Sequence, residues 1–316
     1  MNIVFMGTPD FALETLKQIH NGGHNILAVV CQPDKQVGRG MKVQMPPTKE
    51  YALANNIDVL QPEKIRNNEE FLEKIKSLKP DIIVVVAYGK ILPQELLDIP
   101  KYGSMNVHGS LLPKYRGAAP IQWAIINGDE TTGVTTMKMD AGMDTGDIYL
   151  TSEIPIEKDD TYGTLYEKLK LLGARLAVKT LDDILDGTIK PKKQGDDFTT
   201  APMIFKENTK IDFYKSAYSA VNLIRGVNPA PGAWFVYEDK VFKVWKAEEL
   251  SEDYLSEEEQ NNNPGSIVVS NSKEGLIITT SSGLLNVLEI QAPNSKRMPI
   301  KDYLRGNELK VGTILS

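Results

Sequence analysis

DIIVVVAYG, at residues 81–89, is the most consistently apolar segment of this chain. Its apolar residues follow one another without alternation, so a strand formed here must be covered on both faces. Outward from it, NIVFM (2–6), NILAVVC (25–31) and MNVHGS (105–110) have a similar character. Helical patterns over 9–20, 48–56 and 67–79 separate these runs. Strands that alternate with helices predict a mainly parallel α/β sheet of the Rossmann-like, doubly wound kind.

The alternation continues to about residue 186, with a helix starting near Pro120, strands at 134–139 and 147–156, and a helix over 161–186. Charged and turn residues without a period follow, and predict a linker over 189–207. After a helix over 215–226, short strands recur about every ten residues, at 233–238, 241–247, 266–270, 275–280 and 284–290. We therefore expect an α/β domain over 1–188 and a smaller β-barrel domain over 208–316.

The composition is that of a globular protein: 316 residues, 41% hydrophobic, with a net charge of −6. No apolar run approaches the roughly 20 residues of a membrane span, and the N-terminus has no basic region typical of a signal peptide. One cysteine, Cys31, excludes a disulfide framework, and we expect it to be buried. A cytoplasmic protein is expected. Because the net charge is negative, binding to nucleic acid would require a local basic patch.

The segment QPDKQVGRGMKVQMPPT (32–48) is rich in proline, glycine and basic residues. It has neither a helical nor a strand period, so we expect a long loop, and loops of this length are usually functional. Lys35, Arg39 and Lys42 make it the best candidate for a basic patch.

The chain has three histidines, His20, His24 and His108. His20 and His24 flank Gly22-Gly23 at a predicted helix end, and we expect both at the surface. His108 instead lies where a strand ends, the place where open α/β sheets bind ligands. Asn106 precedes it by two positions, so both side chains point to the same side of the strand.

Two polar loops follow. SLLPKYRGAAP (110–120) comes directly after the strand of His108, and MDAGMDTGD (139–147) carries three carboxylates and two glycines. The second loop does not have the spacing of an EF-hand. Its carboxylates either cap turns or include one that fixes the tautomer of His108. The first strand-to-helix turn, GTPD (7–10), does not match G-x-G-x-x-G, so a dinucleotide cofactor is not expected.

Asn106-x-His108, the 110–120 loop and Asp144 together resemble the 10-formyltetrahydrofolate-dependent formyltransferases. The resemblance covers almost the whole chain and includes FMGTPDF (5–11), VVAYG (85–89) and VWKA (244–247). It implies transfer of a formyl group from 10-formyltetrahydrofolate to the α-amine of initiator methionyl-tRNA, without a metal. Asn106 would stabilise the oxyanion, His108 would act in acid–base catalysis, and Asp144 would orient His108.

The resemblance also implies binding residues. The folate would contact an apolar slot and the loop beyond the strand at 134–139, through Tyr88, Gly89, Ile91, Leu92, Ser110, Leu111, Leu112, Pro113 and Asp140. Core packing is the alternative for Ile91 and Leu92. In this family the Leu112–Pro113 peptide tends to be cis.

For the tRNA, the resemblance implies that the segment with Lys35, Arg39 and Lys42 enters the acceptor arm. Arg39 would be the residue that recognises it. A phosphate-binding track would use Lys206, Lys210, Arg225, Lys243, Lys246, Lys296 and Arg297, although each of these residues taken alone is more often an ordinary surface charge. An OB-fold-like barrel in the second half would suit this role. We expect a monomer.

Three other functions use the same features: formyl transfer to a small amine such as a sugar nucleotide or glycinamide ribotide, hydrolysis of the formyl-folate, and non-enzymatic RNA binding. Small-amine enzymes usually lack the basic segment at 35–42 and this type of second domain. The intact set of Asn106, His108 and Asp144 argues against simple RNA binding.

Overall fold

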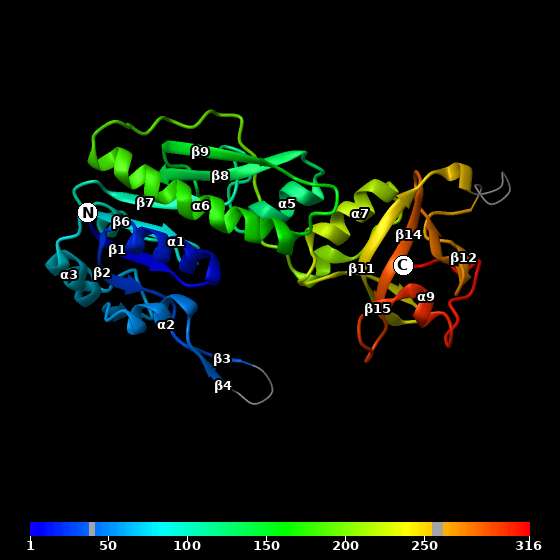
Figure 1. Cartoon of the computed structure of the whole chain (residues 1–316). Helices are drawn as coiled ribbons and strands as arrows, with labels where there is room; N and C mark the ends of the chain where they lie inside the picture. Colours follow the sequence, from blue (N-terminus) through cyan, green and yellow to red (C-terminus); the bar gives the residue numbers. More distant parts are fainter. Residues whose placement is uncertain (38–41, 255–261) are drawn as a thin grey trace. The chain divides into compact units, whose positions relative to one another are not determined.

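The computed structural model describes residues 1–37, 42–254 and 262–316 (Figure 1). They form two compact units. Unit 1 comprises Met1–Pro120, Thr131–Pro155 and Tyr166–Ala201, and unit 2 comprises Ile121–Glu130, Ile156–Leu165 and Pro202–Ser316. None of the helices in these residues combines the length and the apolar character needed to cross a membrane.

Unit 1 contains a sheet with the strand order β5-β2-β1-β6-β7-β8-β9. The strands from β5 to β7 pair in parallel, and β8 is antiparallel to both of its neighbours. This confirms the predicted mainly parallel α/β sheet, with all five residues of β6 buried at its centre. The strands are β1 (Asn2–Gly7), β2 (Asn25–Val30), β5 (Val59–Leu60), β6 (Ile82–Val86), β7 (Ser104–His108), β8 (Thr131–Lys138) and β9 (Ile148–Pro155).

Helices cover both faces of this sheet, as its continuous apolar strands require. On one face, Val4 and Val85 share a core cluster with Ile75 of α3 and Leu96 of α4. On the other face, a side chain at Gly173 of α6 would meet Val107 of β7 at 3.1 Å. The helices are α1 (Asp10–Asn21), α2 (Pro47–Ala54), α3 (Glu69–Leu78), α4 (Gln94–Leu97) and α6 (Tyr162–Leu185), whose first four residues belong to unit 2.

The segment 32–48 was expected to be a long loop without strands. Lys35–Val37 (β3) pairs antiparallel with Lys42–Gln44 (β4), so that prediction was wrong. Strands of three residues are too short to display the alternation by which strands are recognised in a sequence. Residues 38–41, and with them Arg39, lie outside the described residues.

Two single residues test the sequence predictions in unit 1. Cys31 is fully buried at the end of β2, as predicted. His24 is 6% exposed, so the expected surface position is wrong. Its Nδ1 lies 3.4 Å from the N-terminal amine and its Nε2 lies 3.5 Å from Asp182 Oδ1. These neighbours are remote in sequence, and only the folded chain brings them to His24.

Unit 2 is built on an antiparallel sheet with the order β10-β11-β14-β13-β12, and β15 pairs with β14. This confirms the predicted second β domain. Ser216 caps the N-terminus of helix α7 (Ala217–Gly226), because its side chain accepts a hydrogen bond from the N–H of Ser219. The described strands are β10 (Ala233–Tyr237), β11 (Lys240–Leu250), β12 (Ile267–Asn271), β13 (Gly275–Thr279), β14 (Leu284–Gln291) and β15 (Met298–Pro299). Besides α7, the described helices are α5 (Pro120–Ile126), α9 (Ile300–Tyr303) and the 3₁₀ helices η1 (Lys206–Thr209) and η2 (Glu252–Tyr254). The first residue of α5 belongs to unit 1.

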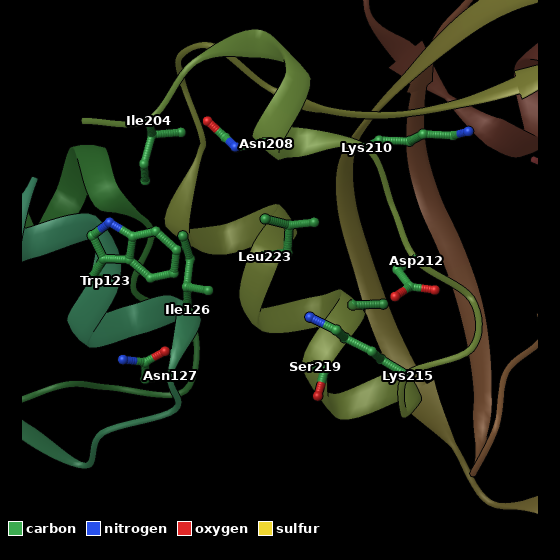
Figure 2. Close-up of a pocket in the computed structure, with 11 residues that line it drawn as sticks. Trp123, Ile126, Asn127, Ile204, Asn208, Lys210, Asp212, Lys215, Ser219 and Leu223 are labelled. Atoms are coloured by element: carbon green, nitrogen blue, oxygen red, sulfur yellow. The ribbon is translucent and has the colours of Figure 1, made fainter. Parts of the chain in front are cut away.

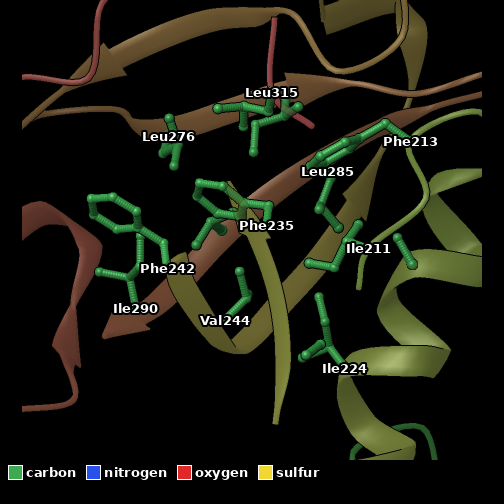
Figure 3. Close-up of a cluster of buried hydrophobic side chains, with 14 of the residues drawn as sticks. Ile211, Phe213, Ile224, Phe235, Phe242, Val244, Leu276, Leu285, Ile290 and Leu315 are labelled. Atoms are coloured by element: carbon green, nitrogen blue, oxygen red, sulfur yellow. The ribbon is translucent and has the colours of Figure 1, made fainter. Parts of the chain in front are cut away.

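The core of unit 2 is aromatic and aliphatic (Figure 3). The rings of Phe235 and Phe242 stack with centroids 5.7 Å apart, and Phe213 lies 6.3 Å from Phe235. Ile224 extends this core from α7. Burying a side chain of this size contributes about 1.5–3 kcal/mol, so this cluster accounts for much of the stability of the unit.

Candidate active site

The site is built on the end of β7. Val107 faces α6, so alternation along the strand places Asn106 and His108 on the opposite face. His108 is 6% exposed, and Asn106 is half-buried. Within the described part of the chain, no hydrogen bond occupies the side-chain amide of Asn106. The amide is therefore available to a bound molecule.

Both ring nitrogens of His108 have neighbours. Nε2 lies 2.9 Å from the backbone carbonyl oxygen of Tyr115. Because a carbonyl can only accept, Nε2 carries the proton and donates it to this bond. Nδ1 lies 3.7 Å from Oδ2 of Asp144. In the neutral imidazole, Nδ1 is thus the nitrogen that can take up a proton, with a carboxylate beside it.

Asp144 lies in the loop between β8 and β9, with a positive φ of 55°. Its Oδ2 accepts a hydrogen bond of 2.8 Å from the N–H of Gly117. Asp140 in the same loop accepts from the N–H of Gly142 at 3.0 Å and from the Thr145 hydroxyl at 2.7 Å. Asp140 therefore caps a turn, which is the first alternative raised by the sequence. Asp144 lies next to His108, but the hydrogen bond that sets the tautomer of His108 goes to the Tyr115 carbonyl.

The loop after β7 is held from within unit 1. The Ser110 hydroxyl is fully buried and donates to the carbonyl of Lys114 at 2.6 Å. The Thr135 hydroxyl on β8 donates to the Ser110 carbonyl at 2.7 Å and accepts from the N–H of Leu112 at 3.1 Å. The Leu112–Pro113 peptide is cis, as the resemblance implied. Leu111 and Pro113 are half-buried.

The other residues predicted for the folate differ in exposure. Leu92 is 4% exposed and belongs to the core of unit 1, whereas Ile91 is 57% exposed. Tyr88 is almost fully buried, and burial raises its pKa to about 12. Gly89 has a φ of 81°, a conformation that favours glycine. The packing alternative thus holds for Leu92, while Ile91 is open to solvent.

A cavity of about 740 Å³ lies in unit 1 where β7 begins and β8 ends. Its lining includes Ser104, Lys138, Asp140, Asp147 and Tyr149. Of the residues predicted to bind folate, Asp140 lines this cavity and the others do not. Burial raises the pKa of Tyr149, and the nearby Asp147 adds to the effect. No sequence motif pointed to this cavity, because its walls come from segments far apart in the chain.

A second cavity, of about 380 Å³, lies within unit 2 (Figure 2). The Trp123 ring and the side chains of Ile126 and Leu223 form an apolar wall, and Lys210 and Lys215 also line the cavity. The indole N–H of Trp123 donates to the Pro202 carbonyl at 2.8 Å.

Basic residues of unit 2 lie beside two tryptophans. The Lys210 amine is 5.8 Å from the centre of the Trp234 ring. The Lys243 amine and the guanidinium carbon of Arg297 each lie 5.4 Å from the centre of the Trp245 ring. The three remaining lysines predicted for this unit, Lys206, Lys246 and Lys296, are exposed. Cations close to aromatic rings are a common feature of surfaces that bind single-stranded nucleic acid.

Arg225 does not belong with these residues, although the sequence allowed it. Its guanidinium donates to the backbone carbonyls of Glu157, Lys158 and Asp160 at 3.1, 3.0 and 3.1 Å. Burial lowers the pKa of Arg225 from its ordinary value. Arg225 therefore holds a turn inside unit 2.

In unit 1, Lys35 is exposed on β3, Lys42 lies on β4, and Arg39 is outside the described residues. Close to the start of β3, the Lys49 amine contacts the Asp34 carboxylate at 2.8 Å. Gln61 donates to Asp34 at 2.8 Å and also accepts from Lys49. These contacts tie the two ends of the 32–48 segment together.

Sequence reasoning missed Gln194, which was assigned to the linker. Its amide nitrogen donates to the carbonyls of Asp144 and Gly146 at 2.8 and 2.7 Å. A single glutamine in a polar stretch carries no signal of such a role. Among the described residues, no group of three or more histidine, cysteine, aspartate and glutamate side chains is placed to hold a metal ion.

Comparisons with known proteins show the family to which the chain belongs. A family profile described as formyl transferase matches residues 1–181, and one described as formyl transferase, C-terminal domain, matches residues 203–308. A methionyl-tRNA formyltransferase from Caldanaerobacter subterraneus subsp. tengcongensis is 51% identical over 316 residues, which is 100% of both chains.

Two solved structures share the fold. The N-formyltransferase from Helicobacter canadensis, in complex with folinic acid and dTDP-3-aminofucose, has a TM-score of 0.65 at 23% identity, covering 90% of this chain and 98% of that chain. HypX from Aquifex aeolicus has a TM-score of 0.63 at 18% identity. The match covers 98% of this chain and 49% of the HypX chain. The family profile and the full-length identity together lead to one assignment. The chain belongs to the formyl transferase family and, within it, groups with the methionyl-tRNA formyltransferases.

Proposed function

We propose that this protein transfers the formyl group of 10-formyltetrahydrofolate to the α-amine of initiator methionyl-tRNA, with Asn106, His108 and Asp144 as its catalytic residues. The observation that carries the proposal is the position of Asp144 Oδ2, 3.7 Å from His108 Nδ1, with Asn106 and His108 two residues apart on one face of β7. Full-length identity of 51% to a methionyl-tRNA formyltransferase supports the choice of acceptor.

In this reaction the amine attacks the formyl carbon and the carbonyl oxygen takes up negative charge. The bond from that carbon to N10 then breaks, and N10 takes a proton. Asn106 donates an amide N–H to the oxyanion, a contact that strengthens as charge develops. One such donor typically contributes about 10²–10³ in rate.

His108 takes the proton that the attacking amine loses. Its Nε2–H is held by the Tyr115 carbonyl, which leaves the lone pair of Nδ1 for that proton. Once Nδ1 is protonated, the Asp144 carboxylate at 3.7 Å stabilises the imidazolium. General acid–base catalysis of this kind contributes about 10²–10⁴.

The folate binds along the two loops that meet at His108. We assign to it the residues Tyr88, Gly89, Ile91, Leu92, Ser110, Leu111, Leu112, Pro113 and Asp140. Leu92, Ser110 and Leu112 are buried and shape the slot from behind, whereas Ile91 is exposed enough for direct contact.

The tRNA binds through basic residues of both units. In unit 1 these are Lys35, Arg39 and Lys42 of the 32–48 segment. In unit 2 they are Lys206, Lys210 and Lys246, next to Trp234 and Trp245 in the sheet. Phosphate contacts supply affinity, while the planar guanidinium of Arg39 is suited to a base edge.

We further propose a catalytic domain over 1–188, a linker over 189–207, part of which packs on the catalytic domain, and a tRNA-binding domain over 208–316. The protein acts as a cytoplasmic monomer without membrane contact. The cytoplasmic location is inferred from the acceptor, because charged initiator tRNA is used in translation.

An acceptor assay tests the function. Formyl-labelled 10-formyltetrahydrofolate is supplied with methionyl-tRNA, with an amino sugar nucleotide, or with no acceptor, and the labelled carbon is followed. We expect label on methionyl-tRNA. Label on the sugar would identify a small-amine enzyme, free formate without acceptor would identify a hydrolase, and no turnover would leave RNA binding alone.

A further inference from the structure

Residues 192–201 were expected to be linker, yet they are bound along the loops of the candidate active site. Lys192 and Ile148 exchange two backbone hydrogen bonds, of 2.7 and 2.8 Å. The N–H of Arg116 donates to Thr199 O at 2.9 Å, and the N–H of Ala201 donates to Arg116 O at 2.7 Å. We call residues 192–201 the return segment.

The return segment fits closely against the loop after β7. Gly117 has a φ of 124°, and a Cβ there would lie 2.7 Å from the carbonyl oxygen of Ala201. Only glycine satisfies both conditions. The Thr199 hydroxyl also accepts a hydrogen bond of 2.9 Å from the N–H of Tyr115. The loop that supplies the Tyr115 carbonyl to His108 is therefore anchored on the return segment.

Gln194 extends this anchoring to the second loop of the site. Its Nε2 donates to Asp144 O at 2.8 Å and to Gly146 O at 2.7 Å. Its Oε1 accepts from Arg116 Nε at 3.1 Å and from Arg116 Nη2 at 2.8 Å. A glutamine amide has two N–H donors and two acceptor lone pairs, and all four are used here. Arg116 in turn lies 4.5 Å from the Phe198 ring centre.

The contacts of Gln194 fall on the two residues whose positions matter for His108. Asp144 carries the carboxylate beside Nδ1 and has a left-handed backbone conformation, which costs a non-glycine residue roughly 1 kcal/mol or more. Arg116 lies between Tyr115, whose carbonyl holds Nε2, and Gly117, whose N–H binds Asp144. Gln194 thus joins Asp144 to Arg116, the residue that follows Tyr115, through one side chain.

We propose that Gln194 is a positioning residue, which sets the distance between Asp144 and His108 by tying the 139–147 loop to Arg116. This inference rests on the proposed function of Asp144 and His108. Gln194 touches neither His108 nor the Asp144 carboxylate, so it acts on the chemical step through them. A displacement of about 1 Å in a catalytic group can cost about 10²-fold in rate.

Gln194→Glu is the sharpest variant, because a carboxylate keeps the size and the contact to Arg116 but cannot donate to the two carbonyls. We expect kcat to fall about 10- to 100-fold, with KM for formyl-folate and for methionyl-tRNA unchanged within about twofold. Asp197→Asn, an exposed change of the reverse kind in the same segment, is the matched control and should keep wild-type kinetics.

A double-mutant cycle separates positioning from a general structural effect. In an Asp144→Ala background the Gln194→Glu substitution should cost little further kcat, because the group that it misplaces is gone. Full additivity of the two losses, or wild-type kcat in Gln194→Glu, would overturn the inference. Gln194→Met, which introduces a neutral side chain of similar size, is measured as a second variant beside Gln194→Glu. If circular dichroism shows both variants unfolded, Gln194 serves stability and the inference fails. An inactive wild type would instead refute the proposed function.

Discussion

Oδ2 of Asp144 lies 3.7 Å from Nδ1 of His108, although His108 ends strand β7 and Asp144 lies in the loop between β8 and β9. The opposite nitrogen of the ring is already bonded to the Tyr115 carbonyl. The imidazole is thus held in one tautomer with its free nitrogen next to a carboxylate. This arrangement suits a base that becomes charged during the reaction, because the charge then has a partner.

Removal of the two β7 side chains should affect chemistry and not folding. We expect Asn106→Ala to lower turnover of methionyl-tRNA by about 10²–10³ and His108→Ala by about 10²–10⁴. The measurement is initial rate at saturating substrates, with circular dichroism as a check of folding. His20→Ala, a histidine of the same unit that contacts Tyr51 and not the site, is the control. Near-normal turnover in either folded variant would remove that residue from the mechanism.

The exposed basic residues of unit 2 should matter for tRNA and not for folate. Lys210→Ala combined with Lys246→Ala should raise KM for methionyl-tRNA and leave KM for formyl-folate unchanged. Each lost phosphate contact should reduce the salt dependence of log affinity by about 0.7–0.9. Lys273→Ala, an exposed lysine in the turn between β12 and β13, is the control. An unchanged salt slope in the double variant would exclude these lysines from the interface.

The buried thiol of Cys31 should resist modification. Burial raises its pKa to about 11, so the reactive thiolate is scarce at neutral pH and the sulfur is shielded from reagents. We expect Ellman's reagent to modify the native protein only as fast as it unfolds, and to react at once in urea. Rapid reaction of the native protein at pH 8 would contradict the described burial.

The Asp10 carboxylate should make stability depend on acid pH. Burial alone would raise the pKa of Asp10, but hydrogen bonds from Tyr166 and Lys170 outweigh it and hold the pKa below the ordinary value. Asp10 thus stays charged in the folded protein at a pH where it is protonated in the unfolded chain. Its contribution is present above about pH 4 and is lost as the pH falls through the folded-state pKa.

Tyr166→Phe tests this linkage. At pH 7 we expect the free energy of unfolding in urea to fall by about 1 kcal/mol, since Asp10 is partly exposed. The difference from wild type should narrow as the pH falls below 4. Tyr214→Phe, at an exposed tyrosine, serves as control and should show no such narrowing. A difference that is constant with pH would mean that Tyr166 does not stabilise the charged form of Asp10.

The sequence alone determined the main strands and helices of the α/β sheet and the nature of the chemistry. An uninterrupted apolar run such as 82–86 must be covered on both faces, so β6 and the parallel α/β architecture follow from composition and spacing. Asn106 and His108 share a face because residues two apart on a strand always do. Both conclusions depend on periodicity, which is a local property.

Only the tertiary structure decided which distant groups meet. It placed Asp144, and not Asp140, beside His108, packed Leu92 into the core while Ile91 stayed exposed, and enclosed His24. It also joined Gln194 to Arg116 and Asp144, across 78 and 50 residues of chain. Contacts at such separation depend on how the loops close over the sheet. The polar residues that make them have no period, so nothing in their own neighbourhood marks their partners.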